Sequence, residues 1–262
     1  MLEKLALIMR KAGDIIRAAD HGAMVIEAKS SPGDMVTYYD IAVQDMLFQE
    51  LRSILPEAGF IGEENGVNTG DNSGYCFLVD PIDGTANFAR DYHHSSVSVG
   101  LAYAGRLVIG LVLNPYLDEL FYAQAGQGAF LNGRPIHASE RGLSDSIVLF
   151  GTSPHDKSKV DETFALAKLL HLNSLDVRRS GSAALDLCYV AAGRCELFFE
   201  MRLEPWDYAA ASLIVQEAGG VVTTLDGHPL GLGGPHSVLA GGWQAYHDYW
   251  NLSSLSKGMS RA

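Results

Sequence analysis

The fold and the chemistry of this chain are decided by one stretch, Tyr75-Cys76-Phe77-Leu78-Val79-Asp80-Pro81-Ile82-Asp83-Gly84-Thr85. Its first five residues are apolar and predict a buried strand, so Asp80 and Asp83 follow at the strand end. Pro81 restrains Asp80 to extended geometry, and Gly84 allows a tight turn close to a ligand. Two acids at a strand end favour an oxygen cage for Mg²⁺, with the N–H groups of Gly84 and Thr85 facing a phosphate at a helix start. The alternative is an acidic surface turn.

Two further acidic segments strengthen the prediction of a metal site. Gly62-Glu63-Glu64 follows the apolar pair Phe60-Ile61, and Trp206-Asp207 opens an apolar stretch with helical character. Alone, the first segment is typical of a solvated loop and the second of a helix N-cap. Together with Asp80 and Asp83, they supply carboxylates from three separate strand ends, as metal sites in open α/β sheets do.

Length and composition indicate a globular protein. The chain has 262 residues, of which 47% are hydrophobic and 19% charged, and this permits one large domain or two closely packed lobes. No apolar run approaches the roughly 18 residues of a membrane span, and the start Met1-Leu2-Glu3-Lys4 does not resemble a signal peptide. Cys76, Cys188 and Cys195 lack CxxC spacing and are expected as buried thiols, which fits a cytoplasmic location.

The net charge of −12 disfavours nucleic acid and anionic membrane surfaces as partners. The same negative charge would repel a phosphate substrate unless bound cations lay between the protein and the phosphate. Clustered carboxylates repel one another and attract divalent cations. Two or three Mg²⁺ ions per subunit would neutralise the cluster and present positive charge to a small-molecule phosphate monoester.

Residues 1–140 are predicted to form an N-terminal lobe that holds most of the metal ligands. It would combine a helix pair with a largely antiparallel sheet. The expected helices cover about 2–20 and 41–55, after a polar loop around 30–34, and the expected strands cover 95–103, 107–114, 120–125 and 129–131. Asn132-Gly133 predicts a tight turn.

Residues 141–262 are predicted to form a C-terminal α/β lobe that completes the site. Strands are expected over 146–150, 175–179, 196–200, 221–224 and 237–240, with helices over 160–170, 183–192, 207–218 and 243–255. This alternation implies a second sheet layered with helices. The two lobes together are expected to form one compact catalytic unit of the α/β (α+β) class.

The chain resembles the inositol monophosphatase family over nearly its whole length. The resemblance lies in blocks that occur in the family's order: Lys29 to Pro32, Asp34 to Thr37, Phe60 to Glu64, Asp80 to Thr85, Gly181 to Leu187, Trp206-Asp207 and Glu217 to Gly220. It implies a layered αβαβα sandwich of the inositol monophosphatase and fructose-1,6-bisphosphatase type, with the site between two sheets. Haloacid-dehalogenase phosphatases are excluded, because one residue separates their two aspartates, whereas two separate Asp80 from Asp83.

The resemblance also implies a set of metal ligands. One Mg²⁺ would be bound by Glu63, Asp80 and the carbonyl of Ile82, and a second by Asp80, Asp83 and Asp207, with Asp80 bridging both. A third, weaker ion would lie near Glu63. Acidic ligands without His or Cys favour a hard cation over zinc.

The catalytic residues implied by the resemblance are Asp40, Thr85 and Glu63. Thr85 and Asp40 would orient and deprotonate a water activated by the metal, which attacks phosphorus directly. The plainer interpretations are a capping hydroxyl for Thr85 and a helix N-cap for Asp40. Lys29 and Glu64 are expected in supporting roles.

Substrate contacts implied by the resemblance come from Asp83, Gly84, Thr85, the backbone near Ala184, and Glu200. A carboxylate at Glu200 suits the hydroxyl groups of an inositol ring. Arg202 would either pair with Glu200 or contact an anionic substrate. The histidines are scattered and are expected at the surface or in the core.

The expected function is therefore a Mg²⁺-dependent hydrolase of inositol monophosphates, with the homodimer and lithium sensitivity typical of the family. The alternatives are related phosphatases acting on 3′-phosphoadenosine 5′-phosphate, fructose 1,6-bisphosphate, histidinol phosphate or NADP. A regulatory binding protein is a further alternative, against which the intact set of acids argues.

Overall fold

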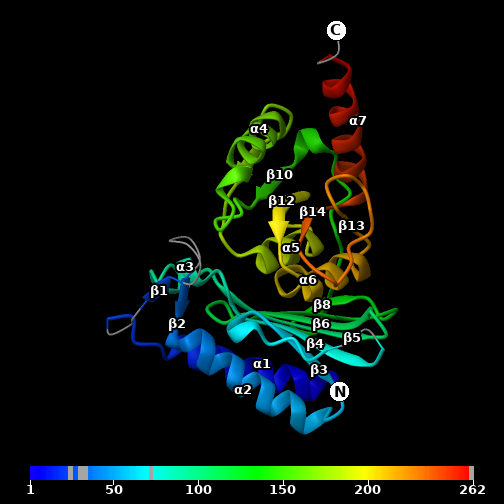
Figure 1. Ribbon diagram of the computed structural model, residues 1–262. Helices are drawn as coiled ribbons and strands as arrows, with labels where there is room; N and C mark the ends of the chain where they lie inside the picture. Colours follow the sequence, from blue (N-terminus) through cyan, green and yellow to red (C-terminus); the bar gives the residue numbers. More distant parts are fainter. Residues whose placement is uncertain (23–25, 29–34, 71–72, 260–262) are drawn as a thin grey trace.

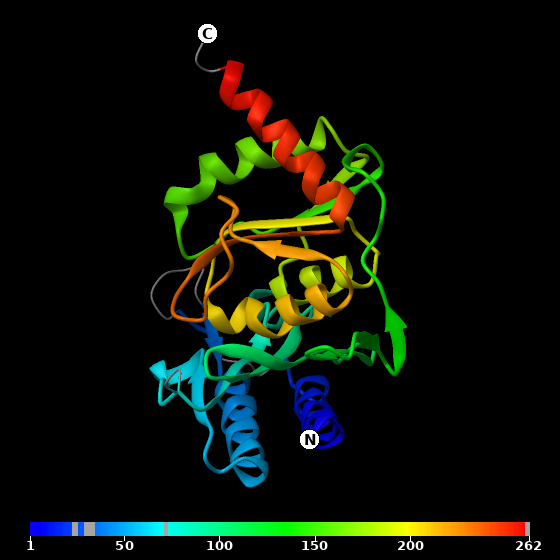
Figure 2. The same ribbon diagram turned by 90° about the vertical axis from the view of Figure 1, so that its right-hand side faces the viewer.

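The computed structural model describes residues 1–22, 26–28, 35–70 and 73–259. Its elements stack in five layers, in which three helix pairs alternate with a seven-stranded and a five-stranded sheet (Figures 1 and 2). The predicted αβαβα sandwich is thereby confirmed. Lys29 and the loop predicted around 30–34 lie outside the described residues.

The first layer is a pair of amphipathic helices, α1 (Leu2–Arg17) and α2 (Tyr38–Ile54). Apolar side chains at helical spacing bury one face of α1: Leu5, Ile8, Met9, Ala12 and Ile16. The second helix begins three residues before the predicted start, because Thr37 caps it and its hydroxyl accepts a hydrogen bond from the amide of Tyr39. No helix within the described ranges is long and apolar enough to cross a membrane.

The seven-stranded sheet follows in the order β3-β4-β5-β6-β7-β8-β9. Only β3 and β4 run parallel, and the other neighbouring strands are antiparallel. The strands are β3 (Gly59–Gly62), β4 (Tyr75–Asp83), β5 (Ser96–Tyr103), β6 (Arg106–Asn114), β7 (Glu119–Gln124), β8 (Ala129–Leu131) and β9 (Arg134–Ile136). The predicted turn at Asn132-Gly133 has positive φ at both residues and adds β9, a strand that was not predicted.

Strand β4 is longer than predicted, because it continues through the acidic run to Asp83. Its register against β5 shifts between Asp80, which pairs with Ser98, and Asp83, which pairs with Ser96. The shift lies at Pro81, which cannot donate a ladder hydrogen bond. The two acids therefore lie within a bulged strand end rather than beyond the strand.

The five-stranded sheet is mixed and has the order β11-β10-β12-β14-β13. Strand β10 runs parallel to β11 and β12, whereas β14 runs antiparallel to β12 and β13. The strands are β10 (Ile147–Phe150), β11 (Asp176–Arg178), β12 (Leu197–Leu203), β13 (Val221–Thr223) and β14 (His236–Gly241). Helices α4 (Val160–His171) and α7 (Trp243–Met259) cover its outer face (Figure 1). The boundary predicted near residue 140 falls between the two sheets, and the division into lobes stays a prediction.

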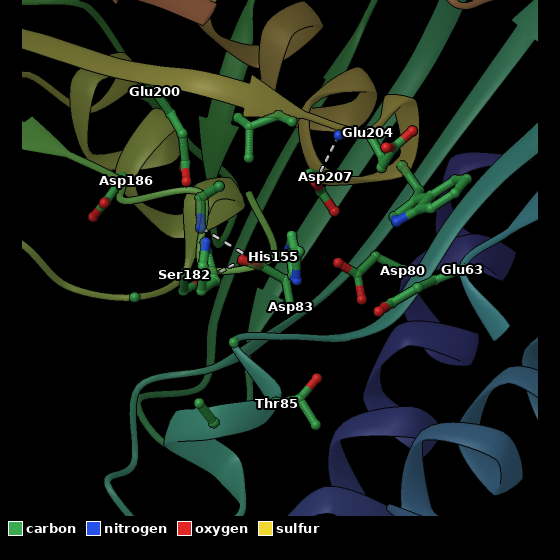
Figure 3. A pocket seen from close by; sticks show the side chains of 18 of the residues that line it. Glu63, Asp80, Asp83, Thr85, His155, Ser182, Asp186, Glu200, Glu204 and Asp207 are labelled. Atoms are coloured by element: carbon green, nitrogen blue, oxygen red, sulfur yellow. Dashed lines mark hydrogen bonds between the residues drawn. The ribbon is translucent and has the colours of Figure 1, made fainter. Parts of the chain in front are cut away.

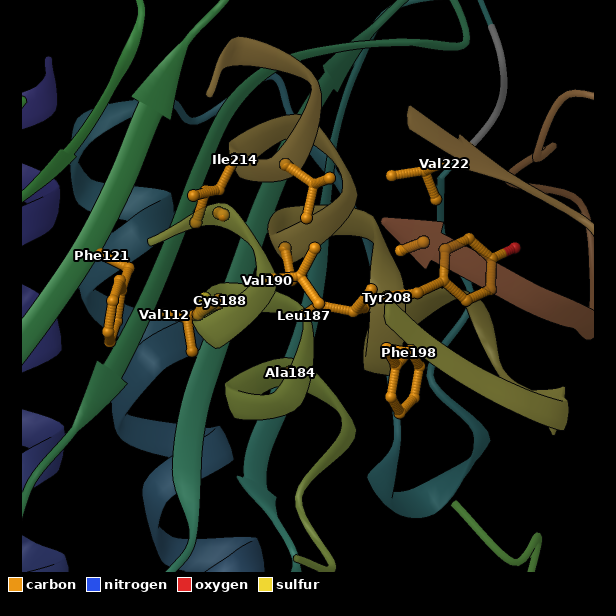
Figure 4. Close-up of a cluster of buried hydrophobic side chains, with 14 of the residues drawn as sticks. Val112, Phe121, Ala184, Leu187, Cys188, Val190, Phe198, Tyr208, Ile214 and Val222 are labelled. Atoms are coloured by element: carbon orange, nitrogen blue, oxygen red, sulfur yellow. The ribbon is translucent and has the colours of Figure 1, made fainter. Parts of the chain in front are cut away.

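Helices α5 (Ala183–Ala191) and α6 (Pro205–Glu217) form the middle layer between the sheets. Figure 4 shows the apolar cluster that joins them to Phe121 on one side and Phe198 on the other. Helix α6 lies very close to the first sheet, since a Cβ added at Gly110 would overlap the carbonyl oxygen of Ala210. The small residues at this contact bring α6, and the acid at its start, against the strand layer.

This contact predicts that Gly110→Ala destabilises the protein. The added methyl group forces backbone apart in a packed core, which costs about 1–3 kcal/mol and lowers Tm by roughly 3–10 °C. Gly74→Ala is the matched control, because a Cβ there would meet nothing within 4 Å. Thermal unfolding measures both variants, and equal Tm values would contradict the close approach of α6 to the sheet.

Candidate active site

A cleft of about 610 Å³ lies between the two sheets and is lined by both of them and by the start of α5 and α6. The predicted residues that line it are Glu63, Asp80, Ile82, Asp83, Gly84, Thr85, Glu200 and Asp207. Figure 3 shows the metal-ligand candidates Glu63, Asp80 and Asp207 on one side of the cleft and Glu200 on the other. Eight acidic residues and two arginines line the cleft, so its charge is strongly negative.

The acids on the metal side raise one another's pKa. The pKa of Asp80 lies well above its usual range because of burial, and the charges of Glu63, Asp83 and Asp207 add to the effect. Burial is also the main cause of the raised pKa of Asp207. The charges of Glu63 and Asp83 add to the effect of burial on Asp207. A buried group of this kind is stable in its ionised form only with cations nearby.

The side chains of Asp40 and Asp207 are held by the same helix-capping arrangement. Each is the third residue of its helix in a capping box, with Thr37 as the N-cap of α2 and Glu204 as the N-cap of α6. Asp207 Oδ2 accepts a hydrogen bond of 2.8 Å from the amide of Glu204, and Asp40 Oδ2 accepts one of 2.8 Å from the amide of Thr37. The N-cap interpretations of both aspartates are therefore wrong, and each keeps its Oδ1 for another partner.

Thr85 and Asp40 come together as predicted. The Thr85 hydroxyl lies 3.2 Å from Asp40 Oδ1 and 3.1 Å from the carbonyl oxygen of Ile82, and it can donate to either. Thr85 begins the short helix α3 (Thr85–Phe88) and lines the cleft, whereas Asp40 is fully buried behind it. Among the described residues, Thr85 connects Asp40 with the lining of the cleft.

Asp83 is turned toward the start of α5. Its Oδ2 accepts hydrogen bonds from the hydroxyl groups of Ser96 and Ser182 and from the amide of Ala184, at 3.0 Å for the amide. Its Oδ1 accepts a bond of 3.1 Å from the amide of Ala183 and keeps further acceptor capacity. Because the Ala184 amide already donates to Asp83, direct contact of that amide with a substrate stays a prediction.

Glu200 lies near the middle of β12, which continues three residues beyond the predicted strand end. Its Oε1 accepts a hydrogen bond of 2.7 Å from the amide of Ser153, and its carboxylate fills the space that a side chain at Gly151 would need. Burial raises the pKa of Glu200 to about 7. The Arg202 guanidinium lies 3.1 Å from Glu204 rather than against Glu200, and its contact with an anionic substrate stays a prediction.

The donor set fits Mg²⁺ in its chemistry and its charge. The ligand candidates are oxygens, which suit a hard cation, and acidic neighbours raise the pKa of both Asp80 and Asp207. Among the described residues, however, no three acidic, histidine or cysteine side chains stand close enough to enclose an ion. Asp83 and Asp207 instead accept backbone hydrogen bonds. Side-chain rotation would be needed to complete the cage.

Other predicted residues lie away from the cleft or outside the described ranges. Glu64 is buried, and its backbone is held by the amide of Gln44 at 2.9 and 3.1 Å, so its supporting role stays a prediction. Lys29 is outside the described residues. His155 is exposed, as expected of a surface histidine, and it also lines the cleft.

Sequence reasoning missed further residues of the cleft, among them Arg179, Asp186 and Ser182. Ser182 and Asp186 lie inside the block Gly181 to Leu187, whose polar positions were a usable signal. Arg179 and His155 come from segments without a recognisable pattern. Only the fold brings them to the site.

Comparison with known proteins places these features in a family. The model of the family described as "Inositol monophosphatase family" matches residues 2–255 of this chain. The Nus factor SuhB of Salmonella typhimurium is 38% identical over 220 residues, covering 83% of this chain and 82% of the relative. The inositol-1-monophosphatase of Mesorhizobium japonicum is 40% identical over 202 residues, covering 75% and 74%. The crystal structure of the extragenic suppressor protein suhB from Bartonella henselae superposes with a TM-score of 0.87 at 34% identity, covering 93% and 94%.

The raised pKa of Glu200 predicts a pH-dependent stability. The folded protein holds the proton of Glu200 up to about pH 7, whereas the unfolded chain loses it near the ordinary value of 4.5. Stability is therefore full below pH 4.5 and falls by about 3 kcal/mol as the pH rises to 7. Glu200→Gln removes this loss, so the variant should exceed the wild type in Tm by roughly 5 °C at pH 8 and match it near pH 4.5.

Thermal unfolding at both pH values in the presence of a chelator measures this effect. The matched control is Glu162→Gln on the exposed side of α4, which should differ little from the wild type at either pH. A Glu200→Gln variant whose difference from the wild type is the same at both pH values would contradict the raised pKa.

Proposed function

The chain belongs to the inositol monophosphatase family, and we propose that it is a Mg²⁺-dependent phosphomonoesterase acting on inositol monophosphates. The observation that carries this proposal is that Glu63, Asp80 and Asp207 line one cleft and that the charges of Glu63 and Asp207 raise the pKa of the buried Asp80. Two or three Mg²⁺ ions per subunit would balance this charge.

Bound Mg²⁺ would draw the phosphate into the cleft and lower the pKa of a water molecule beside it. Thr85 would orient that water. Its hydroxyl hydrogen is directed at Asp40 or the Ile82 carbonyl, which leaves a lone pair of Oγ1 to accept a hydrogen bond from the water. Asp40 is positioned to take up the proton through Thr85. The water would attack phosphorus directly, and no phospho-enzyme is formed.

The leaving group would lie on the other side of the cleft, against Glu200. Since Ser153 takes Oε1 of Glu200, its Oε2 is left to accept a hydrogen bond from a ring hydroxyl. The cleft of about 610 Å³ has room for a six-membered polyol and its phosphate. The predominance of acids favours a leaving group that carries hydroxyl groups over one that carries a second phosphate.

A second candidate is a regulatory role beside catalysis. The observation that favours it is the relative of 38% identity that carries the name Nus factor. The set of acids in the cleft supports hydrolysis as the first candidate. The variant Asp80→Asn would distinguish catalysis from a regulatory role. It should abolish catalysis, whereas it leaves the outer surface available to a regulatory partner unchanged.

Metal dependence is the first test of the proposed function. Excess chelator should abolish phosphate release from inositol monophosphate, and added Mg²⁺ should restore it. Asp80→Asn should lower kcat by at least about 100-fold, because Asp80 is one of the residues that would hold Mg²⁺ in the cleft. Asp91→Asn, an exposed aspartate outside the cleft, is the control and should retain full activity. Full turnover in chelator would refute the proposal.

Glu200→Ala tests the assignment of the leaving-group side. A hydrogen bond to a buried carboxylate contributes roughly 1.5–3 kcal/mol, so kcat/KM for inositol monophosphate should fall about tenfold or more. p-Nitrophenyl phosphate lacks those hydroxyl groups, and its kcat/KM should change little. Equal losses on both substrates, with a lower Tm, would show that Glu200 serves the fold instead.

A further inference from the structure

We infer that Asn87 is a positioning residue, which fixes the leaving-group side of the cleft relative to the phosphate side. This inference rests on the proposed function for its kinetic meaning, although the contact itself is independent of it. Asn87 lies in α3, two residues after Thr85, and it is absent from the residues that line the cleft. It would therefore act through the segments that it holds.

The Asn87 amide joins three segments. Its Nδ2 donates hydrogen bonds to the carbonyl oxygens of His94, at 2.7 Å, and Ser180, at 3.0 Å. Both partners are acceptors, so the side chain must supply two donor hydrogens, and among uncharged side chains of this size only an amide does so. Helix α3 is thereby tied to the loop before β5 and to the turn before α5.

The turn at Ser180–Ser182 lies directly against Gly84, the residue that follows the acidic end of β4. Gly181 has a φ of 99°, and a Cβ added there would lie 2.9 Å from Asn87 Nδ2. A Cβ added at Gly84 would lie 2.8 Å from the carbonyl oxygen of Gly181. The two glycines therefore let the backbones approach closely enough for the Asn87 amide to reach across.

What this turn positions is the start of α5. The amides of Ala183 and Ala184 hold the carboxylate of Asp83, and Asp186 lines the cleft one turn of helix later. Asn87 thus connects the helix that begins at Thr85 with the segment that orients Asp83. Substrates that contact both sides of the cleft should depend on this connection more than substrates that contact only the phosphate side.

The kinetic test compares two substrates on one variant. Asn87→Ala should lower kcat/KM for inositol monophosphate about tenfold or more, and that for p-nitrophenyl phosphate by less than about threefold. The matched control is Asn132→Gly. It removes a similar amide, which donates to Asp118 at 2.7 Å and accepts from Leu120 at 3.0 Å, at a turn remote from the cleft lining. Its ratio of the two kcat/KM values should equal that of the wild type.

A second variant approaches the same contact from the other side. Gly181→Ala pushes the turn away from Asn87, so its effect on the substrate ratio should not add to that of Asn87→Ala. Additive effects in the double variant would overturn the inference. So would an unchanged ratio in Asn87→Ala and Gly181→Ala. If Asn87→Ala fails to fold, Asn87→Asp, which keeps the size of the side chain and lacks both donor hydrogens, decides by its ratio.

Amide hydrogen exchange separates this inference from the proposed function. In Asn87→Ala the amides of Ala183 and Ala184 should exchange at least about tenfold faster than in the wild type, with the core of α6 unchanged. If the wild type hydrolyses neither substrate, the proposed function fails, and the exchange rates still decide whether Asn87 holds the turn. Unchanged exchange at both amides would overturn the inference.

Discussion

The main constraint on this structure is the free-energy cost of bringing several negatively charged carboxylates close together away from water. Asp80, Asp83 and Asp207 come from two different layers, and each has a raised pKa; Asp80 and Asp83 are buried, and Asp207 is partly buried. Apolar packing alone would not keep three carboxylates in one place, because each loses its hydration there. The fold compensates with backbone hydrogen bonds at Asp83 and Asp207. Asp80 receives one from the amide of Ile82 at 3.0 Å, inside the bulged end of β4.

Helix starts supply most of this compensation. The first turn of a helix has free N–H groups and a partial positive charge, both of which favour carboxylates. Asp40 and Asp207 use the starts of α2 and α6, and Asp83 uses the start of α5. Three helices from two layers thus place their positive ends near a single negative cleft. This arrangement allows a strongly acidic site to exist in a folded protein before any cation binds.

The sequence was sufficient for the order of most elements and for Glu63, Asp80, Asp83 and Asp207, the acids that line the cleft. Apolar periodicity located the helices and most strands, and the acidic motifs converge as predicted. The orientations of the side chains in the site could not be predicted from the sequence. Asp83 faces α5 because of Ser96 and Ser182, which lie far away in the chain. Local patterns also favoured an N-cap for Asp40 and Asp207, although both lie at the third helical position. Tertiary contacts, which no single segment encodes, decide such details.

The close contact of α6 with the first sheet has a mechanical consequence. Gly100 and Gly110 admit the backbone of Ala210 almost directly against the strands, so the layer that carries Asp207 and the layer that carries Asp80 cannot slide past each other without a steric clash. The two layers that supply the acids on the metal side of the cleft therefore form a single stiff frame. Admission of a substrate must then rely on side-chain rotation and on the loops at the rim.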